Sequence, residues 1–287
     1  MATPLTADSL VGALTAEGVR IVEYGDWRNH NRNTKGPWGP VNGVVIHHTV
    51  TSGTDGSVAL CYNGDSELPG PLCHGVIDKD GTVHLVGNGR ANHAGSGDDD
   101  VLTAVINETA LPAPDEDNTD GNARFYGFEC INLGDGSDPW PEAQLEAIAR
   151  VSAAICRAHG WHAASVIGHL EWTDKKIDPK GFSMASMRNR VAAVLAGTPG
   201  AGATRYQPFP GDAWFAAAPH STIVAAMGGR LVAEGCSAYT TGPGPQWGEA
   251  DRASYAKWQQ KLGYTGTDAD GLPGATSWNA LRVPYTA

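Results

Sequence analysis

Short apolar runs rich in β-branched residues predict the strands of a sheet. Residues 41–49 contain the run Val44 to Ile46, which is typical of a buried strand. Side-chain alternation then places the next two residues, His47 and His48, on opposite faces of that strand. Similar patterns predict a hairpin over 74–86 with its turn at Asp80-Gly81, and strands over 125–131 and 166–169.

Two segments have the three-to-four-residue apolar spacing of amphipathic helices. The first begins near Pro141 and ends at Gly160, a natural C-terminal stop. The second has Ser183 as its N-cap and ends at Gly197. Because strands alternate with helices along the chain, the pattern predicts an α/β architecture.

A change of composition near residue 200 divides the chain. The segment 197–204 is rich in Gly, Pro and Ala, as flexible linkers are, and the sequence beyond it is rich in aromatic residues and Gly. We therefore expect one domain over 1–196, a linker over 197–204 and a small, mostly helical domain over 205–287. The helices expected in the last domain cover 221–235, 249–262 and 275–281.

The segment Asp98 to Gly121 is polar, acidic and without a clear period. It contains Pro112, Pro114 and a run of Asp, Glu and Asn, which indicates a long surface loop. Its acidic residues do not have the spacing of an EF-hand loop, so a solvated loop is the preferred interpretation over a calcium site.

Composition and charge narrow the classes of partner. A formal net charge of -11, without clustered Lys and Arg, argues against nucleic acid. The first residues lack a basic flank followed by an apolar core, and no stretch is apolar enough to span a bilayer. We expect that the protein does not insert into a membrane and that it is synthesised in the cytoplasm of the producing cell.

The five cysteines show no C-x-x-C spacing, although Cys61 and Cys73 could pair across a loop.

Two histidines lie at the ends of predicted strands, and an aspartate lies in the loop that follows the second strand. A lone histidine such as His47 is more often a hydrogen-bonded core residue than a ligand. However, His169 also ends a predicted strand, and Asp178 follows nine positions later. Two imidazoles and a carboxylate are the ligand types of a catalytic Zn²⁺ that keeps a fourth position open for water. The set predicts a metal-dependent hydrolase.

A hydrolytic metal site also needs a base for the water and a cation for the negative charge that develops on the attacked carbonyl. Glu129, in an otherwise apolar strand, and Lys176, two residues before Asp178, are the candidates. From position alone, Lys176 could equally be a solvated surface lysine. His93 and His74 could line the cleft and orient substrate, with a structural role favoured for His74.

In chain order, the motifs VVIHHT, CHGVIDKDGTVH, ANHAG, YGFECIN, IGHLEW and KIDP lie between Gly43 and Leu195. This series resembles the zinc-dependent type 2 N-acetylmuramoyl-L-alanine amidases, which share their fold with the peptidoglycan recognition proteins. The resemblance implies a mixed central β-sheet flanked by helices. It does not account for the long acidic segment before Phe125.

The resemblance also implies roles for individual residues. The zinc ligands of the family correspond to His47, His169 and Asp178, and its catalytic lysine corresponds to Lys176. The strand carboxylate that some members use as the base corresponds to Glu129, whereas other members have a tyrosine near the metal instead.

The last part of the chain, from Trp258 to Trp278, is similar to a small three-helix peptidoglycan-binding module with a DG-x-x-G turn. The whole resembles a phage endolysin: a monomeric amidase that is made in the host cytoplasm and acts on the cell wall after release. Two alternatives stay open, a recognition protein that binds peptidoglycan without cutting it and a cytoplasmic amidase that recycles soluble muropeptides.

Overall fold

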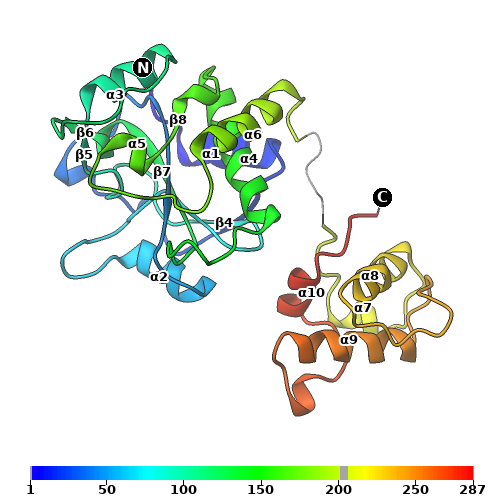
Figure 1. Ribbon diagram of the computed structural model, residues 1–287. Coiled ribbons are helices and arrows are strands. Elements are labelled where there is room, and N and C mark those ends of the chain that lie inside the picture. The colour runs from blue at the N-terminus through cyan, green and yellow to red at the C-terminus, as the bar shows by residue number, and fades with distance from the viewer. Residues whose placement is uncertain (1, 201–205, 287) are drawn as a thin grey trace. The chain divides into compact units, whose positions relative to one another are not determined.

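The computed structural model describes residues 2–200 and 206–286 of the chain. The chain forms two compact units, Met1–Ala203 and Thr204–Ala287. Figure 1 shows a sheet with helices in the first unit and helices alone in the second (Figure 1). Residues 201–204 of the expected linker lie outside the described residues.

A mixed six-stranded sheet forms the centre of the first unit. Its strand order is β1-β4-β3-β7-β2-β8, and all neighbours are parallel except the hairpin β3–β4. The fold class predicted from the sequence is confirmed. The strands are β1 (Arg20–Glu23), β2 (Gly43–His48), β3 (Gly75–Ile77), β4 (Thr82–Leu85), β7 (Phe125–Cys130) and β8 (Val166–Gly168), and β5 (Ser96–Gly97) pairs separately with β6 (Thr119–Asp120).

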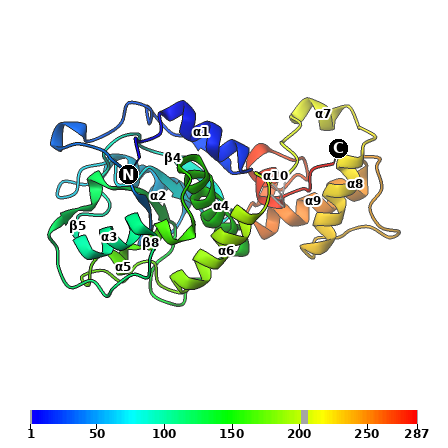
Figure 2. The same cartoon turned by 90° about the horizontal axis from the view of Figure 1, so that it is seen from above.

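Side-chain alternation along β2 divides the core of this unit between two faces of the sheet. Val44 and Ile46 pack in one cluster with residues of α1, α4 and α6. Val45 packs on the other face with residues of α3 and α5. Figure 2 shows these two sets of helices on either side of the sheet (Figure 2). The helices are α1 (Ala7–Ala16), α2 (Thr54–Asn63), α3 (Asp99–Asn107), α4 (Glu142–His159), α5 (His169–Trp172) and α6 (Met184–Ala196).

The two long helices predicted in this unit are confirmed, and their ends have the expected causes. Gly160 follows α4 with a φ of +73°, the left-handed conformation that glycine adopts without steric penalty. The hydroxyl of Ser183 accepts a hydrogen bond from the backbone N–H of Ser186 at 3.2 Å and so caps α6.

The prediction that 98–121 is one irregular loop was wrong, because α3 occupies Asp99–Asn107. The buried carboxylate of Asp98 caps this helix by accepting from the N–H groups of Asp100 and Val101, at 2.7 and 3.1 Å. Val101 and Val105 are buried against Trp172 in the core below. The apolar face of a short helix is thus hidden among acidic residues, and tertiary packing selects it.

The described residues also answer the questions of disulfide bonds and of membrane-spanning helices. All five cysteines are buried and free, including Cys61 and Cys73. Among the described residues, none of the helices combines the length and the apolar character that a bilayer span requires.

The second unit is built around aromatic side chains. Phe215, Trp247 and Trp278 are buried together with Val224 and Leu231. The predicted helices over 221–235, 249–262 and 275–281 are present. The helices of this unit are α7 (Asp212–Ala216), α8 (Thr222–Ala233), α9 (Glu249–Lys261) and α10 (Ala275–Leu281).

Candidate metal centre

The register of two parallel strands brings His47 and His169 together. Ile46 of β2 pairs with Gly168 of β8, so the next residue of each chain segment lies at the same edge of the sheet. The Nδ1 atoms of the two histidines are 3.0 Å apart. Asp178 returns from the loop after α5, and its Oδ2 lies 3.1 Å from each of these nitrogens.

The protonation states of His47 and Asp178 suit a cation site. Burial and the neighbouring imidazole of His169 lower the pKa of His47 to about 4, which leaves its ring neutral near pH 7. Burial opposes ionisation of Asp178, but its contacts with His169 and His47 hold the pKa of Asp178 well below its usual range. The atoms of His47, His169 and Asp178 that could bind a metal ion all lie within 4.8 Å of one another. Two imidazoles and one carboxylate therefore fit Zn²⁺ with an open position.

Glu129 lies beside this triad, because it is the partner of His47 in the register of β2 and β7. Its side chain is partly exposed, yet its Oε2 is buried and has no hydrogen-bond partner. Burial raises the pKa of Glu129 to about 8; the Asp178 carboxylate acts in the same direction and Lys176 opposes both. Glu129 is thus a carboxyl group poised to exchange a proton near neutral pH.

Lys176 is exposed on the loop between His169 and Asp178, at the rim of a cleft that His169 also lines. Its positive charge acts on His47 and on Glu129. The structure therefore brings all five residues with predicted ligand or catalytic roles to one edge of the sheet.

The other two predicted site residues differ in their surroundings. His93 lines the cleft, but its ring is mostly buried, with Nδ1 3.1 Å from Nε2 of His47. His74 is fully buried and stacks on Trp38. Its Nδ1 accepts from the N–H of Gly127 at 2.9 Å, and its Nε2 bonds the carbonyl oxygen of Gly89 at 2.9 Å. Both ring nitrogens of His74 are engaged with the backbone and not with the cleft.

A family model described as N-acetylmuramoyl-L-alanine amidase matches residues 37–181, which include every predicted ligand and catalytic residue. The chain belongs to this family. Among curated proteins, none matches the chain.

Solved structures similar to this chain include two endolysins and one further amidase. The Ph2119 endolysin of a Thermus scotoductus bacteriophage is 15% identical, with a TM-score of 0.41, over 60% of this chain and 99% of its own. The endolysin amidase LysCS from Clostridium intestinale is 16% identical, with a TM-score of 0.39, over 60% and 95%. The amidase AmiD from E. coli is 17% identical, with a TM-score of 0.39, over 88% and 91%.

One wall of the cleft was not predicted from the sequence. A cavity of about 440 Å³ is lined by His93, His169 and Lys176, and also by Asp117 and Thr173. The Thr173 hydroxyl donates to Asp117 Oδ1 at 2.7 Å, and Lys175 forms an ion pair with the same carboxylate. Asp117 belongs to the acidic segment to which the sequence assigned no role. Only the folded chain brings it beside the loop that carries Asp178.

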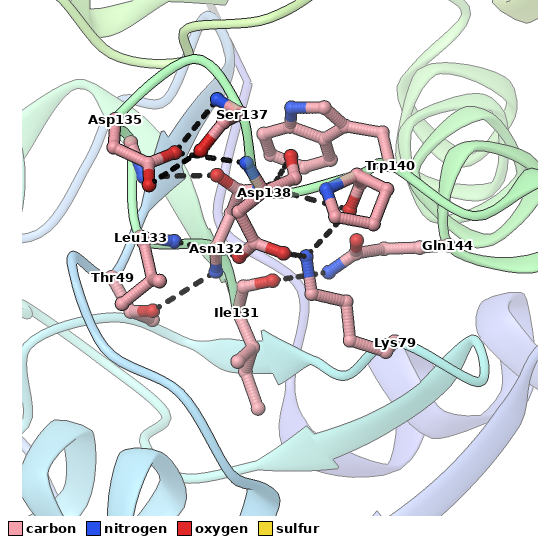
Figure 3. A network of polar contacts seen from close by, with 12 residues as sticks. Thr49, Lys79, Ile131, Asn132, Leu133, Asp135, Ser137, Asp138, Trp140 and Gln144 are labelled. Atoms are coloured by element: carbon pink, nitrogen blue, oxygen red, sulfur yellow. Dashed lines mark hydrogen bonds and ion pairs between the residues drawn. The ribbon is translucent and has the colours of Figure 1, made fainter.

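On the other side of β7's end, the loop 131–140 is fixed by a network of polar contacts (Figure 3). Asp138 accepts from the N–H of Leu133 and from the Lys79 ammonium group, both at 2.9 Å. The Asn132 N–H donates to the Thr49 hydroxyl at 3.3 Å, which ties this loop to the end of β2. These contacts hold the carboxyl ends of β2 and β7, where His47 and Glu129 lie, in a fixed relation.

Proposed function

We propose that the protein is a zinc-dependent amidase that hydrolyses the bond between N-acetylmuramic acid and the L-alanine of the peptidoglycan stem peptide. The observation that carries this proposal is the convergence of His47, His169 and Asp178 beside the unpaired carboxyl of Glu129, at a cleft open to solvent. Family membership supports peptidoglycan amidase chemistry in general, and the site supports the hydrolytic mechanism.

His47, His169 and Asp178 would hold the Zn²⁺. When bound, the ion supplies a Lewis acid that acidifies a water molecule and polarises the carbonyl group that is attacked. The negative charge of Asp178 would partly balance the charge of the ion, and three protein ligands would leave one coordination position open.

Glu129 and Lys176 perform the remaining chemistry. The Glu129 carboxylate accepts a proton from the attacking water, and the resulting acid returns it to the nitrogen of the leaving L-alanine. Burial, which raises the pKa of Glu129 in the metal-free protein, favours its protonated form and so assists the second half of this cycle. Lys176, at the rim of the cleft, stabilises the negative charge that develops on the carbonyl oxygen.

The second unit is proposed to bind the cell wall, which would make the whole protein a monomeric endolysin that acts on the host wall after release from the cytoplasm. Support comes from the similarity of residues 258–278 to a peptidoglycan-binding module. Tethering would raise the local concentration of the amidase on an insoluble polymer. The two alternatives, a recognition protein and a recycling amidase, predict different products and different substrate preferences.

Digestion of purified peptidoglycan, with and without a chelator, tests the reaction. New free L-alanine amino groups that appear only without chelator, and without new reducing sugar ends, are the expected result. Tight binding to peptidoglycan without either product would instead favour the recognition-protein alternative.

Truncation after Gly197 tests the wall-binding role. The truncated enzyme should lose roughly 100-fold or more of its activity on whole walls, the usual range for a lost tether, and retain its activity on soluble muropeptides. Equal activity of both forms on whole walls would favour the recycling alternative.

A further inference from the structure

The two ring nitrogens of His47 face different groups. Nδ1 points to His169 and Asp178, at 3.0 and 3.1 Å. Nε2 points away from them, and its neighbour at 3.1 Å is Nδ1 of His93. Since a neutral imidazole carries its proton on only one nitrogen, the partner of Nε2 decides whether Nδ1 offers a lone pair or a proton.

The chain of hydrogen bonds beyond His93 fixes where the protons lie. His93 Nε2 is 3.2 Å from the carbonyl oxygen of Phe125. A carbonyl oxygen only accepts, so this nitrogen of His93 carries the proton and its Nδ1 offers a lone pair. His47 Nε2 must then be the donor in the bond between the two rings. That leaves the lone pair of His47 on Nδ1, so the Asp178 carboxylate, which lies 3.1 Å from both Nδ1 atoms, takes its hydrogen bond from His169.

The protein holds the His93 ring in place from three directions. The Asn122 side-chain oxygen accepts hydrogen bonds from the backbone N–H groups of His93 and Ala94, both at 2.8 Å. Phe125 of β7 supplies the carbonyl acceptor. Gly127, two residues further along β7, leaves the space for the ring, because a Cβ there would lie 2.3 Å from His93 Nδ1. Together, these contacts and the space beside Gly127 favour one orientation of the His93 ring.

We propose that His93 is a positioning residue that locks His47 in the tautomer with its proton on Nε2, and thereby presents Nδ1 to the metal. This inference rests on the proposed zinc site and goes beyond the role of His93 in substrate binding expected from the sequence. Metal-bound histidines generally donate their outer N–H to an acceptor that orients the ring, and removal of such an acceptor lowers metal affinity about 10- to 100-fold. Here the acceptor is a second imidazole, itself oriented by the backbone.

Zinc affinity, measured by competition with a chromophoric chelator, tests the proposal on the full chain. His93→Leu keeps most of the ring's volume but removes the acceptor, and it should weaken zinc binding about 10- to 100-fold. His93→Asn keeps an acceptor oxygen near the position of Nδ1, and it should recover most of that loss. Asn92→Ala, at the neighbouring position in the cleft, is the matched control and should leave zinc affinity unchanged. Equal affinity of His93→Leu and the unmodified protein would overturn the proposal.

Nitrogen NMR of histidine-labelled unmodified protein gives a second test that does not depend on the folding of a variant. His47 should carry its proton on Nε2 before and after zinc is added, with a scalar coupling across the hydrogen bond to His93 Nδ1. A proton on Nδ1 of His47 in the metal-free protein would overturn the lock. Failure of the unmodified protein to bind zinc, with the expected tautomer present, would instead reject the proposed metal function and retain the hydrogen-bond assignment.

Discussion

The two units of the chain use buried polar side chains differently. In the second unit, buried polar groups bind loops to helices. Gln259 accepts from the N–H of Gly271 at 2.7 Å and donates to the carbonyl oxygen of Leu272 at 2.9 Å. Ser254 likewise accepts from the N–H of Ala238 at 2.8 Å. Each such bond satisfies a backbone group that would otherwise lack a partner.

In the first unit, the buried polar groups at the edge of the sheet are directed at one another instead. The ring nitrogens of His47 and His169 and the Asp178 carboxylate converge, and Glu129 keeps an oxygen without a partner. Buried groups of this kind lower the stability of a fold unless a ligand compensates them. The contrast gives the buried polar groups named in the second unit a structural role, and leaves those at the edge of the sheet in the first unit available to a ligand.

The largest expected effect is the loss of a predicted ligand. His169→Ala should abolish peptidoglycan cleavage and weaken zinc binding by more than about 100-fold, the upper range for residues that only support a ligand. Cleavage assays and zinc titration measure both effects. The second unit should unfold as in the unmodified protein, and full activity of the variant would contradict the zinc assignment.

The next largest effect is expected on the rate of cleavage when Glu129 is replaced. Glu129→Gln should retain zinc but lower the rate of cleavage about 10²- to 10⁴-fold, the usual contribution of a general base. Activity close to that of the unmodified protein would move the base to another group. Glu67→Gln, a change at an exposed glutamate, is the matched control.

The same variant has a pH-dependent effect on stability. The pKa of Glu129 in the folded, metal-free protein is about 8, above the ordinary value of 4.5. The unfolded chain therefore ionises first, and the unmodified protein loses stability as pH rises from 4.5 to 8. Glu129→Gln should gain about 1–3 kcal/mol relative to it above pH 8, because the amide carries no charge that burial penalises. Denaturant unfolding at pH 4 and pH 9 measures the difference, which should vanish at the lower pH.

A core substitution in the second unit should affect stability and leave the chemistry unchanged. Trp278 is buried beside Phe215, with ring centroids 5.5 Å apart, and its Nε1 donates to the carbonyl oxygen of Gln207. Trp278→Ala should destabilise this unit by about 3–5 kcal/mol. Calorimetry should show the loss, while cleavage of soluble muropeptides stays unchanged. Trp214→Ala, at a partly exposed ring, should have the smaller effect.

The smallest effect concerns the space around His93. Gly127→Ala places a Cβ 2.3 Å from His93 Nδ1 and should displace that ring. Zinc affinity should fall about 10-fold, at the low end of the range for a supporting residue. Gly12→Ala is the control, because a Cβ at that position of α1 meets no atom within 4 Å. Equal zinc affinity of the two variants would show that the space around His93 tolerates a side chain at position 127.

Local patterns in the sequence predicted the elements that carry strong signals of their own. The β-branched run at Val44 to Ile46 and the Asp80-Gly81 turn are signals over a few residues, and β2 and the β3–β4 hairpin formed as expected. Helices α1, α2 and α3 were not predicted. In α3, two acidic residues of the first turn masked an apolar face that only packing against Trp172 makes evident.

The sequence by itself determined the chemistry available to this protein: two histidines at the ends of predicted strands, an aspartate in the loop that follows, a strand carboxylate and a nearby lysine. The tertiary structure decided which atoms of these residues meet. Strand register places Ile46 beside Gly168, which brings the two Nδ1 atoms together, and β7 supplies the carbonyl that orients His93. Such contacts join residues more than 30 positions apart, and no local pattern encodes them, because they depend on pairing and packing across the sheet.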